Sequence, residues 1–324
     1  MALILILQID GWKGHDSDII NHGLPFVPGH EFSGIISQVG SSISSFRVGD
    51  RVVAPFILSC GLCEYCEKDR PTICLRQEQP GFTYLGSFAE FVAIPRAERN
   101  VKILPSAVSL VQAAALGCRF TTAYRAVLQQ GRLLEKETVA VFGCGGVGLS
   151  CIMCAKAKNA GMIIAVDVSP TTLEKAKELG ATHTVLIVNQ DNMAAREAVR
   201  RMTNGQGCDL SIDAAGFAPT CENAVYCTRR GGRMVQVGLP IGEVVPLVPM
   251  GLVAGHEIEI YGSHGFAADD LPKLLAMVAQ GSLDPSILVE SEVSLKEGAQ
   301  ALMDMDNKSP LGVTVITRFR ESHI

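Results

Sequence analysis

The stretch Val139-Ala-Val-Phe-Gly-Cys-Gly-Gly-Val-Gly148 decides the fold in the middle of this 324-residue chain. The apolar residues Val139–Phe142 are typical of a buried strand, and a small-residue helical pattern follows the glycines to about Asn159. Between a strand and a helix, the pattern G-x-G-x-x-G permits a tight turn, close approach of the backbone to a pyrophosphate and close helix–strand packing. The helix N-terminus adds N–H groups and a positive dipole for the phosphates. The stretch predicts a dinucleotide-binding βαβ unit; the alternative is a glycine-rich turn in a nucleotide-free α/β domain.

A second apolar strand, Met162–Val166, ends in Asp167, which lies 24 residues after Gly143 (167 − 143). At this place a carboxylate can accept hydrogen bonds from both adenosine ribose hydroxyls, and it repels the additional phosphate of NADP. The sequence therefore predicts NAD as the dinucleotide.

Strands and helices continue to alternate after Asp167, which predicts a doubly wound parallel sheet of about six strands. Ser169-Pro170 is a typical N-cap and first turn of a helix that ends at Gly180. The further strands are predicted near Thr184–Val188, Leu210–Asp213, Arg233–Val237 and Glu257–Tyr261, with helices near Met193–Met202 and Cys221–Thr228. The glycines at or just past strand ends, where ligands bind in such sheets, are Gly216, Gly238 and Gly262; each could also be an ordinary turn glycine.

Four cysteines follow one another closely before this region: Cys60, Cys63, Cys66 and Cys74. Their gaps of two, two and seven residues suit a closed thiolate site around a tetrahedral metal, and we expect structural zinc. A disulfide pair or unrelated thiols are alternatives. An iron–sulfur cluster also uses four cysteines, but its usual runs have different spacing and a proline after the last cysteine.

The region before residue 118 has short, glycine-punctuated strands at Gly34–Val39, Asp50–Ala54, Phe88–Ile94 and Val101–Leu104. It shows no helical period, so we expect a barrel-like β domain. After about residue 265 we expect helices near Asp270–Gln280 and Leu295–Met303 and a strand at Val313–Thr317. The nucleotide domain, residues 118–264, would thus be inserted between residues 1–117 and 265–324 of one catalytic domain.

Composition limits the partners and the compartment. The chain is 48% hydrophobic with a formal net charge of −5, and it has no Lys/Arg-rich run, so we expect neither nucleic acid nor membrane as a partner. The apolar start Met1–Leu7 is too short to span a bilayer and lacks the basic segment and cleavage site of a secretory signal, so we expect a buried strand. Seven of the eleven cysteines (11 − 4) are scattered, which favours a reducing compartment, the cytoplasm.

Three residues outside the cysteine cluster are candidates for a second metal site. His30 and Glu31 follow Pro28-Gly29 in a loop before a strand, and Cys118 lies near the entry to the nucleotide domain. Imidazole and thiolate are typical ligands of a catalytic zinc that keeps an open position. Taken singly, His30 could cap a turn and Cys118 could be one more buried thiol.

Several motifs together resemble one family. They are Gly11-Trp-Lys-Gly-His15-Asp, Val27-Pro-Gly-His30-Glu31, the cysteine cluster, Gly117-Cys118-Arg-Phe-Thr-Thr122, the glycine loop and Gly262-Ser-His-Gly265. In this order they resemble the zinc-dependent alcohol dehydrogenases of the medium-chain dehydrogenase/reductase superfamily, from about residue 11 to the end. The resemblance implies a chaperonin-like (GroES-like) β-rich catalytic domain beside a Rossmann domain, and NAD-linked oxidation of alcohols to aldehydes or ketones.

The resemblance also assigns roles to residues. His30 and Cys118 would bind the catalytic zinc, with Glu31 close behind or as an alternative ligand, and the four clustered cysteines would bind the structural zinc. The residues expected to contact NAD are Thr122, Gly143, Gly145, Gly146, Val147, Gly148, Asp167, Gly216, Val237 and Gly238. Family members are dimers or tetramers, and an Ile-rich last strand at Glu257–Tyr261 invites pairing; a homo-oligomer is expected.

The start of the chain departs from the family. Counted back from Gly11, the places of a cysteine ligand, a Ser/Thr hydroxyl and a frequent histidine hold Leu5, Leu7 and Asp10. Leucine can neither bind zinc nor take the proton of an alcohol, so we expect either a start that is truncated or respliced relative to an active protein, or a form with impaired chemistry. The alternatives to an active alcohol dehydrogenase are a weakly active NAD- and zinc-binding pseudoenzyme and a zinc-independent quinone or enoyl reductase on the same scaffold.

Overall fold

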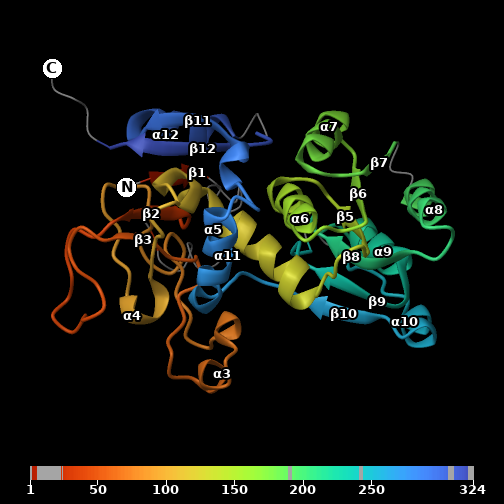
Figure 1. Ribbon diagram of the computed structural model, residues 1–324, viewed down its shortest axis with the longest axis horizontal. Coiled ribbons are helices and arrows are strands. Elements are labelled where there is room, and N and C mark those ends of the chain that lie inside the picture. Colours follow the sequence, from red (N-terminus) through yellow and green to blue (C-terminus); the bar gives the residue numbers. More distant parts are fainter. Residues whose placement is uncertain are drawn as a thin grey trace. The chain divides into compact units, whose positions relative to one another are not determined.

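The structure is a computed structural model that describes residues 2–5, 23, 25–188, 192–240, 244–305 and 310–319 (Figure 1). For residues 2–5 and 192 it describes the backbone alone. The chain divides into two compact units, one formed by Met1–Thr121 with Gly265–Ile324 and the other by Thr122–His264.

The second unit is built on a six-stranded, all-parallel sheet. In spatial order the strands are β10 (Glu259–Gly262), β9 (Thr228–Gln236), β8 (Cys208–Asp213), β5 (Thr138–Phe142), β6 (Met162–Asp167) and β7 (His183–Leu186). The connecting helices are α6 (Gly146–Ala157), α7 (Pro170–Leu179), α8 (Asn192–Met202), α9 (Ala218–Cys227) and α10 (Met250–His256). This is the Rossmann strand order, in which the chain reverses direction beside the first strand. The predicted doubly wound sheet is confirmed.

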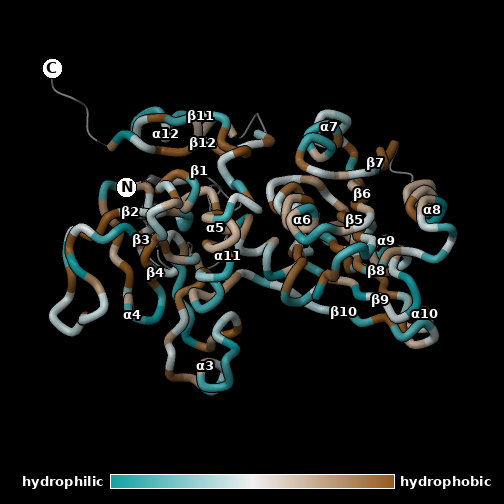
Figure 2. The backbone as a smooth tube through the Cα atoms, viewed as in Figure 1, coloured by the Kyte–Doolittle hydropathy of each residue, from teal (hydrophilic) through white to brown (hydrophobic). Residues whose placement is uncertain are grey.

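Burial explains why the central strands have continuous apolar sequences. Val139, Ala140, Val141 and Phe142 of β5 are fully buried, as expected where helices cover both faces of a parallel sheet. Figure 2 shows hydrophilic residues along α7, which turns only one stripe of side chains inward. The predicted start of α7 is also confirmed, because the Ser169 hydroxyl accepts a hydrogen bond from the Thr172 N–H at 3.2 Å.

The first unit contains a mixed six-stranded sheet. In spatial order its strands are β11 (Val289–Ser294), β12 (Val313–Arg318), β1 (Ala2–Leu5), β2 (Phe32–Ile35), β3 (Arg51–Val53) and β4 (Lys102–Ile103). Strands β11 and β12 are parallel, and the other neighbours are antiparallel. The predicted strand at the start of the chain is confirmed over Ala2–Leu5.

The first unit also contains short helices. They are α3 (Glu64–Glu67), η1 (Pro71–Ile73), α4 (Ala97–Asn100), η3 (Ala268–Asp270), α11 (Leu271–Ala279), η4 (Pro285–Leu288) and α12 (Leu295–Asp304). Helix α5 (Leu110–Tyr124) carries the chain from the first unit into the second and is followed by a π-helical turn, η2 (Arg125–Gln130). Within the described ranges, no helix is both long and apolar enough to cross a bilayer.

Two sequence-based expectations for the first unit are wrong. No strand forms over Phe88–Ile94. The alternating pattern there has another cause, because Phe88, Val92 and Ile94 pack on the core while Phe91 is 63% exposed. One-sided burial of an extended segment gives the same period of two as a strand. The region before residue 118 is not free of helix either, since α5 begins at Leu110.

Candidate metal centres and nucleotide site

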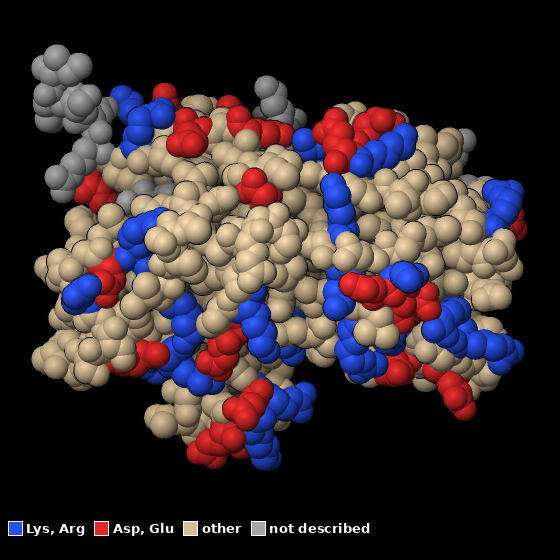
Figure 3. All heavy atoms as spheres, in the orientation of Figure 1, with Lys and Arg blue, Asp and Glu red and all other residues tan. Residues whose placement is uncertain are grey.

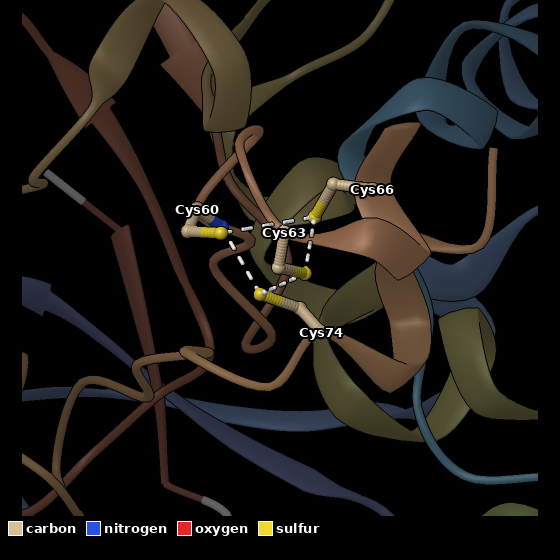
Figure 4. Close-up of side chains that lie close together, drawn as sticks. All are labelled: Cys60, Cys63, Cys66 and Cys74. Atoms are coloured by element: carbon tan, nitrogen blue, oxygen red, sulfur yellow. Dashed lines mark hydrogen bonds between the residues drawn. The ribbon is translucent and has the colours of Figure 1, made fainter. Parts of the chain in front are cut away.

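The four clustered cysteines converge on one point. Their Sγ atoms lie within 4.8 Å of one another, and Figure 4 shows them turned toward each other. The Sγ–Sγ separation is 3.5 Å for Cys63–Cys66, 3.7 Å for Cys63–Cys74 and 4.0 Å for Cys60–Cys66. Four sulfurs about 2.3 Å from a tetrahedral zinc would be about 3.8 Å apart. All four are free thiols, so the disulfide alternative is wrong and the donor set fits a tetrahedral metal.

Local backbone geometry brings these thiols together. Gly61 has φ 75° and turns the chain after Cys60, and Cys63 lies at the N-terminus of α3. Backbone N–H groups of Leu62 and Arg76 donate to sulfurs of the cluster at 3.3 Å each. The bond from Leu62 lowers the pKa of Cys60 to about 6.

Burial has the opposite effect at Cys74, whose pKa it raises. Four neighbouring thiolates repel one another, and a dication removes this conflict because it favours the deprotonated form of every ligand. The lobe has little other core, since Tyr65 is the one partly buried hydrophobic residue in the described part of the chain that packs on the four thiols. A bound metal would therefore be its main source of stability.

A second group of metal-binding side chains is formed by His30, Glu31 and Cys118, whose ligand atoms all lie within 4.8 Å. His30 and Glu31 precede β2, and Cys118 lies in α5. Helix α5 is kinked at Gly117, with φ 14° and ψ −138°. A Cβ at Gly117 would be 2.6 Å from Glu31 Cδ, so only glycine lets the helix come this close to the carboxylate.

The Glu31 carboxylate is held on one side only. Its Oε1 accepts hydrogen bonds from the backbone N–H groups of Cys118 and, at 3.2 Å, Arg119. Its Oε2 is buried without a hydrogen-bond partner among the described residues. Burial raises the pKa of Glu31 to about 7, while the Arg119 guanidinium opposes this shift. A cation is one of the groups that can satisfy a buried carboxylate oxygen of this kind.

His30 has the protonation state that a metal ligand needs. The residue is 5% exposed, and burial lowers its pKa to about 4, which keeps the imidazole neutral. Its ring centroid lies 5.5 Å from that of Phe56 and 5.1 Å from that of Phe82. One imidazole, one carboxylate and one thiolate fit the three-ligand pattern of a catalytic zinc.

The glycine loop of the second unit has the geometry that its sequence predicts. Gly143 has φ 83°, and a Cβ there would be 2.5 Å from that of Ala215. A Cβ at Gly148 would collide with the carbonyl oxygen of Gly143, whereas the space beside Gly145 is open. The loop thus combines a tight turn and close helix–strand packing with backbone that a ligand can approach.

The other residues expected at the nucleotide site lie in the same unit. Asp167 ends β6, where its Oδ2 accepts from the Cys144 N–H at 2.7 Å and its Oδ1 from the Ser169 N–H at 2.8 Å. Gly146 and Val147 begin α6, Val237 and Gly238 follow β9, and Thr122 is buried in α5.

The segments that follow β8 and β9 come close together at two glycines, Gly216 and Gly238. A Cβ on Gly238 would collide with the backbone nitrogen of Gly216, which has φ 78°. Sequence reasoning missed the residue that holds these ends, Asp213, which is fully buried. Its Oδ1 accepts from the N–H groups of Ala215 at 3.0 Å and Gly216 at 3.2 Å, and the Gly238 N–H donates to its carbonyl at 2.9 Å. An Asp at the end of an apolar strand, three residues before a glycine, is the signal that could have revealed it.

The residues that distinguish the start of the chain cannot be placed in the same way. Leu7, Asp10 and the motif Gly11–Asp16 lie outside the described residues, and Leu5 lies in β1 with only its backbone described.

The surface charges are mixed in sign. On the face in view in Figure 3, acidic and basic side chains are intermingled.

Comparisons with known proteins agree with this geometry. The chain matches the family model of the alcohol dehydrogenase GroES-like domain over residues 7–105 and that of the zinc-binding dehydrogenases over residues 146–280. It is 36% identical over 288 residues to a sorbitol dehydrogenase of Bacillus subtilis, an alignment that covers 86% of this chain and 76% of the relative.

Solved structures give the same result. The alcohol dehydrogenase TADH from Thermus sp. ATN1 superposes with a TM-score of 0.88 at 30% identity and covers 98% of this chain and 90% of its own. A structure titled NAD-dependent alcohol dehydrogenase has a TM-score of 0.84 at 30% identity, with the same coverage of 98% and 90%. The expected GroES-like and Rossmann fold class is confirmed, and zinc and NAD agree with these matches. The chain therefore belongs to the zinc-dependent alcohol dehydrogenases of the medium-chain dehydrogenase/reductase superfamily, oxidoreductases that act on CH–OH groups of small molecules.

Proposed function

We propose that this chain oxidises alcohols to aldehydes or ketones, with NAD as hydride acceptor and a catalytic zinc bound by His30, Glu31 and Cys118. The observation that carries the proposal is the convergence of these three ligand atoms within 4.8 Å, with one Glu31 oxygen buried and unpartnered among the described residues. We favour polyols as substrates because a relative at 36% identity is named sorbitol dehydrogenase.

The residues of this centre would act together. Zinc, when bound, supplies a Lewis acid that polarises an alcohol oxygen, and NAD, when bound, accepts the hydride. Neutral His30 offers a ring nitrogen, and Glu31 is anchored through Oε1 so that Oε2 remains for the metal. Three protein ligands leave the fourth position of a tetrahedral site for substrate.

We assign the remaining site residues by the same reasoning. Cys60, Cys63, Cys66 and Cys74 hold a structural zinc, because all four positions of that site are taken by protein. The loop Gly143–Gly148 and the strand ends at Asp167, Gly216 and Gly238 bind NAD. The domain assignment expected from the sequence remains a proposal, with residues 1–117 and 265–324 as catalytic domain and residues 118–264 as NAD-binding domain.

An assay with a panel of alcohols tests this function. Purified chain should form NADH with polyols or secondary alcohols, lose the activity on chelation and regain it with zinc. NAD and zinc binding without turnover would support the pseudoenzyme alternative, and zinc-independent reduction of quinones or enones would support the reductase alternative. The expectation of weak turnover, which rests on Leu5, Leu7 and Asp10, stays a prediction that this assay decides.

The cofactor preference is the first quantitative expectation. Asp167 should make the chain bind NAD at least about tenfold more tightly than NADP, a difference of about 1.4 kcal/mol, because its carboxylate repels a 2′-phosphate. The next residues, Val168 and Ser169, provide no cation for that phosphate. Titration of both nucleotides measures the preference, and Asp167→Asn should narrow it. Equal or tighter binding of NADP by the unmodified chain contradicts the assignment.

The edge of the parallel sheet bears on the oligomeric state of the chain. We propose a homodimer or homotetramer joined through β10, an edge strand of the parallel sheet with Ile260 41% exposed. The exposed apolar residues of this unit include Val244, Val245, Leu247 and Met250, which precede β10 in the sequence. Light scattering at micromolar concentration should show an oligomer that Ile260→Lys disrupts. Ile103→Lys, on edge strand β4 of the other sheet and 54% exposed, is the matched control. A monomeric unmodified chain contradicts the proposal.

The state of the cysteines bears on the compartment. All eleven are free thiols in the structure, and most are buried. Because disulfides form in oxidising compartments, we propose that the protein works in a reducing one, the cytoplasm.

A further inference from the structure

A buried amide outside the metal cluster holds the residue before its first ligand. Asn100 ends α4 and is fully buried. Its Oδ1 accepts a hydrogen bond from the Ser59 N–H at 2.9 Å, and its Nδ2 donates to the Ser59 carbonyl at 3.1 Å. One side chain thus satisfies both backbone groups of the residue directly before Cys60.

The same amide is tied to its own helix. Asn100 Nδ2 also lies 3.2 Å from the Arg96 carbonyl and 3.5 Å from that of Pro95. These contacts fix the orientation of the amide group, and with it the direction of its two hydrogen bonds to the Ser59 backbone. Asn side chains commonly form such hydrogen bonds to nearby backbone groups at turns and helix ends.

Arg99, the residue before Asn100, also binds Ser59. Arg99 Nε donates to the Ser59 hydroxyl at 3.3 Å, and its Nη2 forms an ion pair with Asp269 Oδ2 at 2.7 Å. The Arg99 stem lies 3.8 Å from the place of a Cβ on Gly61. Helix α4 therefore binds Ser59, the residue before Cys60, and its Arg99 side chain lies beside Gly61, the residue after it.

Within the lobe, Cys60 makes two hydrogen bonds of 3.3 Å, one from its own N–H to Cys74 Sγ and one from the Leu62 N–H to its Sγ. Cys63 and Cys66 are linked by one turn of chain, α3, whereas Cys60 comes before the Gly61 turn. Of the hydrophobic side chains that the structure describes, Tyr65 alone packs on the thiols, so apolar packing does little to fix the first ligand. Metal sites tolerate errors of only about 0.2 Å in ligand distance.

We propose that Asn100 is a positioning residue for the metal of the cysteine lobe: by fixing Ser59 it places Cys60 Sγ among the other three sulfurs, and zinc retention depends on it. The proposal rests on the assignment of the four cysteines to one zinc and is independent of the proposed catalytic centre. Replacing a residue that supports a metal ligand typically lowers the metal affinity about 10–100-fold.

Three variants test the proposal, each made in a Cys118→Ser background so that only lobe zinc is counted. Asn100→Ala removes both bonds to Ser59, and Asn100→Asp keeps the Oδ1 acceptor but loses the donor. Asn223→Ala is the matched control, because Asn223 is also a buried asparagine and accepts from Arg196 at 3.2 Å, far from the lobe in sequence. Zinc transfer to a chromogenic chelator, the thiolate-to-cobalt absorption after cobalt exchange, and Tm are measured for each.

Asn100→Ala should weaken lobe zinc binding about 10–100-fold, Asn100→Asp by less, and Asn223→Ala not at all, even if all three lower Tm. Wild-type zinc affinity and cobalt spectrum in Asn100→Ala, with only Tm lowered, would overturn the proposal and leave Asn100 an ordinary core residue. If Asn100→Ala does not fold, Asn100→Asp decides by the same two readouts. Absence of lobe zinc from the background protein contradicts the metal assignment itself and is thereby told apart from failure of the Asn100 proposal.

Discussion

Cys66→Ser is expected to release one zinc ion per chain and to lower the free energy of unfolding by about 4 kcal/mol or more, the stabilisation given by a ligand present at about a thousand times its Kd. Cys66 is buried in α3 and lies 3.5 Å from Cys63 Sγ and 4.0 Å from Cys60 Sγ. A serine hydroxyl binds zinc poorly, and three sulfurs cannot close the site. The loss should be severe because the lobe has almost no apolar core of its own.

Chemical denaturation and zinc analysis measure this effect. Cys221→Ser is the matched control, because Cys221 is a free thiol in α9 with 8% exposure, close to the 6% of Cys66. The control should keep its zinc and lose much less stability. NAD affinity should change little in Cys66→Ser, since a closed site does no chemistry. Equal losses of stability in the two variants would show that the lobe thiols bind no metal.

His30→Ala is expected to reduce kcat/KM for alcohols by about 10²–10³-fold while NAD binding is preserved. The metal supplies several kcal/mol of charge stabilisation in the transition state, and each tenfold in rate corresponds to about 1.4 kcal/mol. His30 is one of three ligands in the cluster, so its loss should also remove one zinc per chain. The residue belongs to the first unit and the glycine loop to the second, which separates the effects on metal and on nucleotide.

Steady-state kinetics, zinc content and NAD titration on the same preparation test this expectation. His183→Ala serves as control, because His183 lies exposed in β7. A His30→Ala protein with full turnover, or one that loses NAD binding in parallel, would contradict the role assigned to His30.

The parts that were predicted correctly depend on short-range signals. The glycine loop lies next to its strand in the sequence, and Ser169-Pro170 carries the N-cap of α7 by itself. The cysteine lobe also lies within one short stretch, Cys60–Cys74. In each case residue type and spacing alone imply the geometry, so the structure adds detail to the prediction and does not change it.

The parts that could not be predicted depend on contacts between distant residues. Gly117 must be glycine because Glu31, 86 residues earlier (117 − 31), occupies the space of its Cβ. The hydrogen bond between Ser59 and Asn100 joins residues 41 positions apart in the sequence, and no motif predicts it. The alternation in Phe88–Ile94 suggested a strand, but a strand also needs a backbone partner, which a periodic pattern cannot supply.

Zinc analysis of the purified, unmodified chain tests the central claim most directly. Among the described residues there are two groups of convergent metal-binding side chains, the four cysteines and His30–Glu31–Cys118. We predict two zinc ions per chain, falling to one in Cys118→Ser and to one in Cys66→Ser. If the unmodified chain contains only one zinc ion and Cys118→Ser retains it, the catalytic centre is contradicted. An unmodified chain without zinc would contradict both sites.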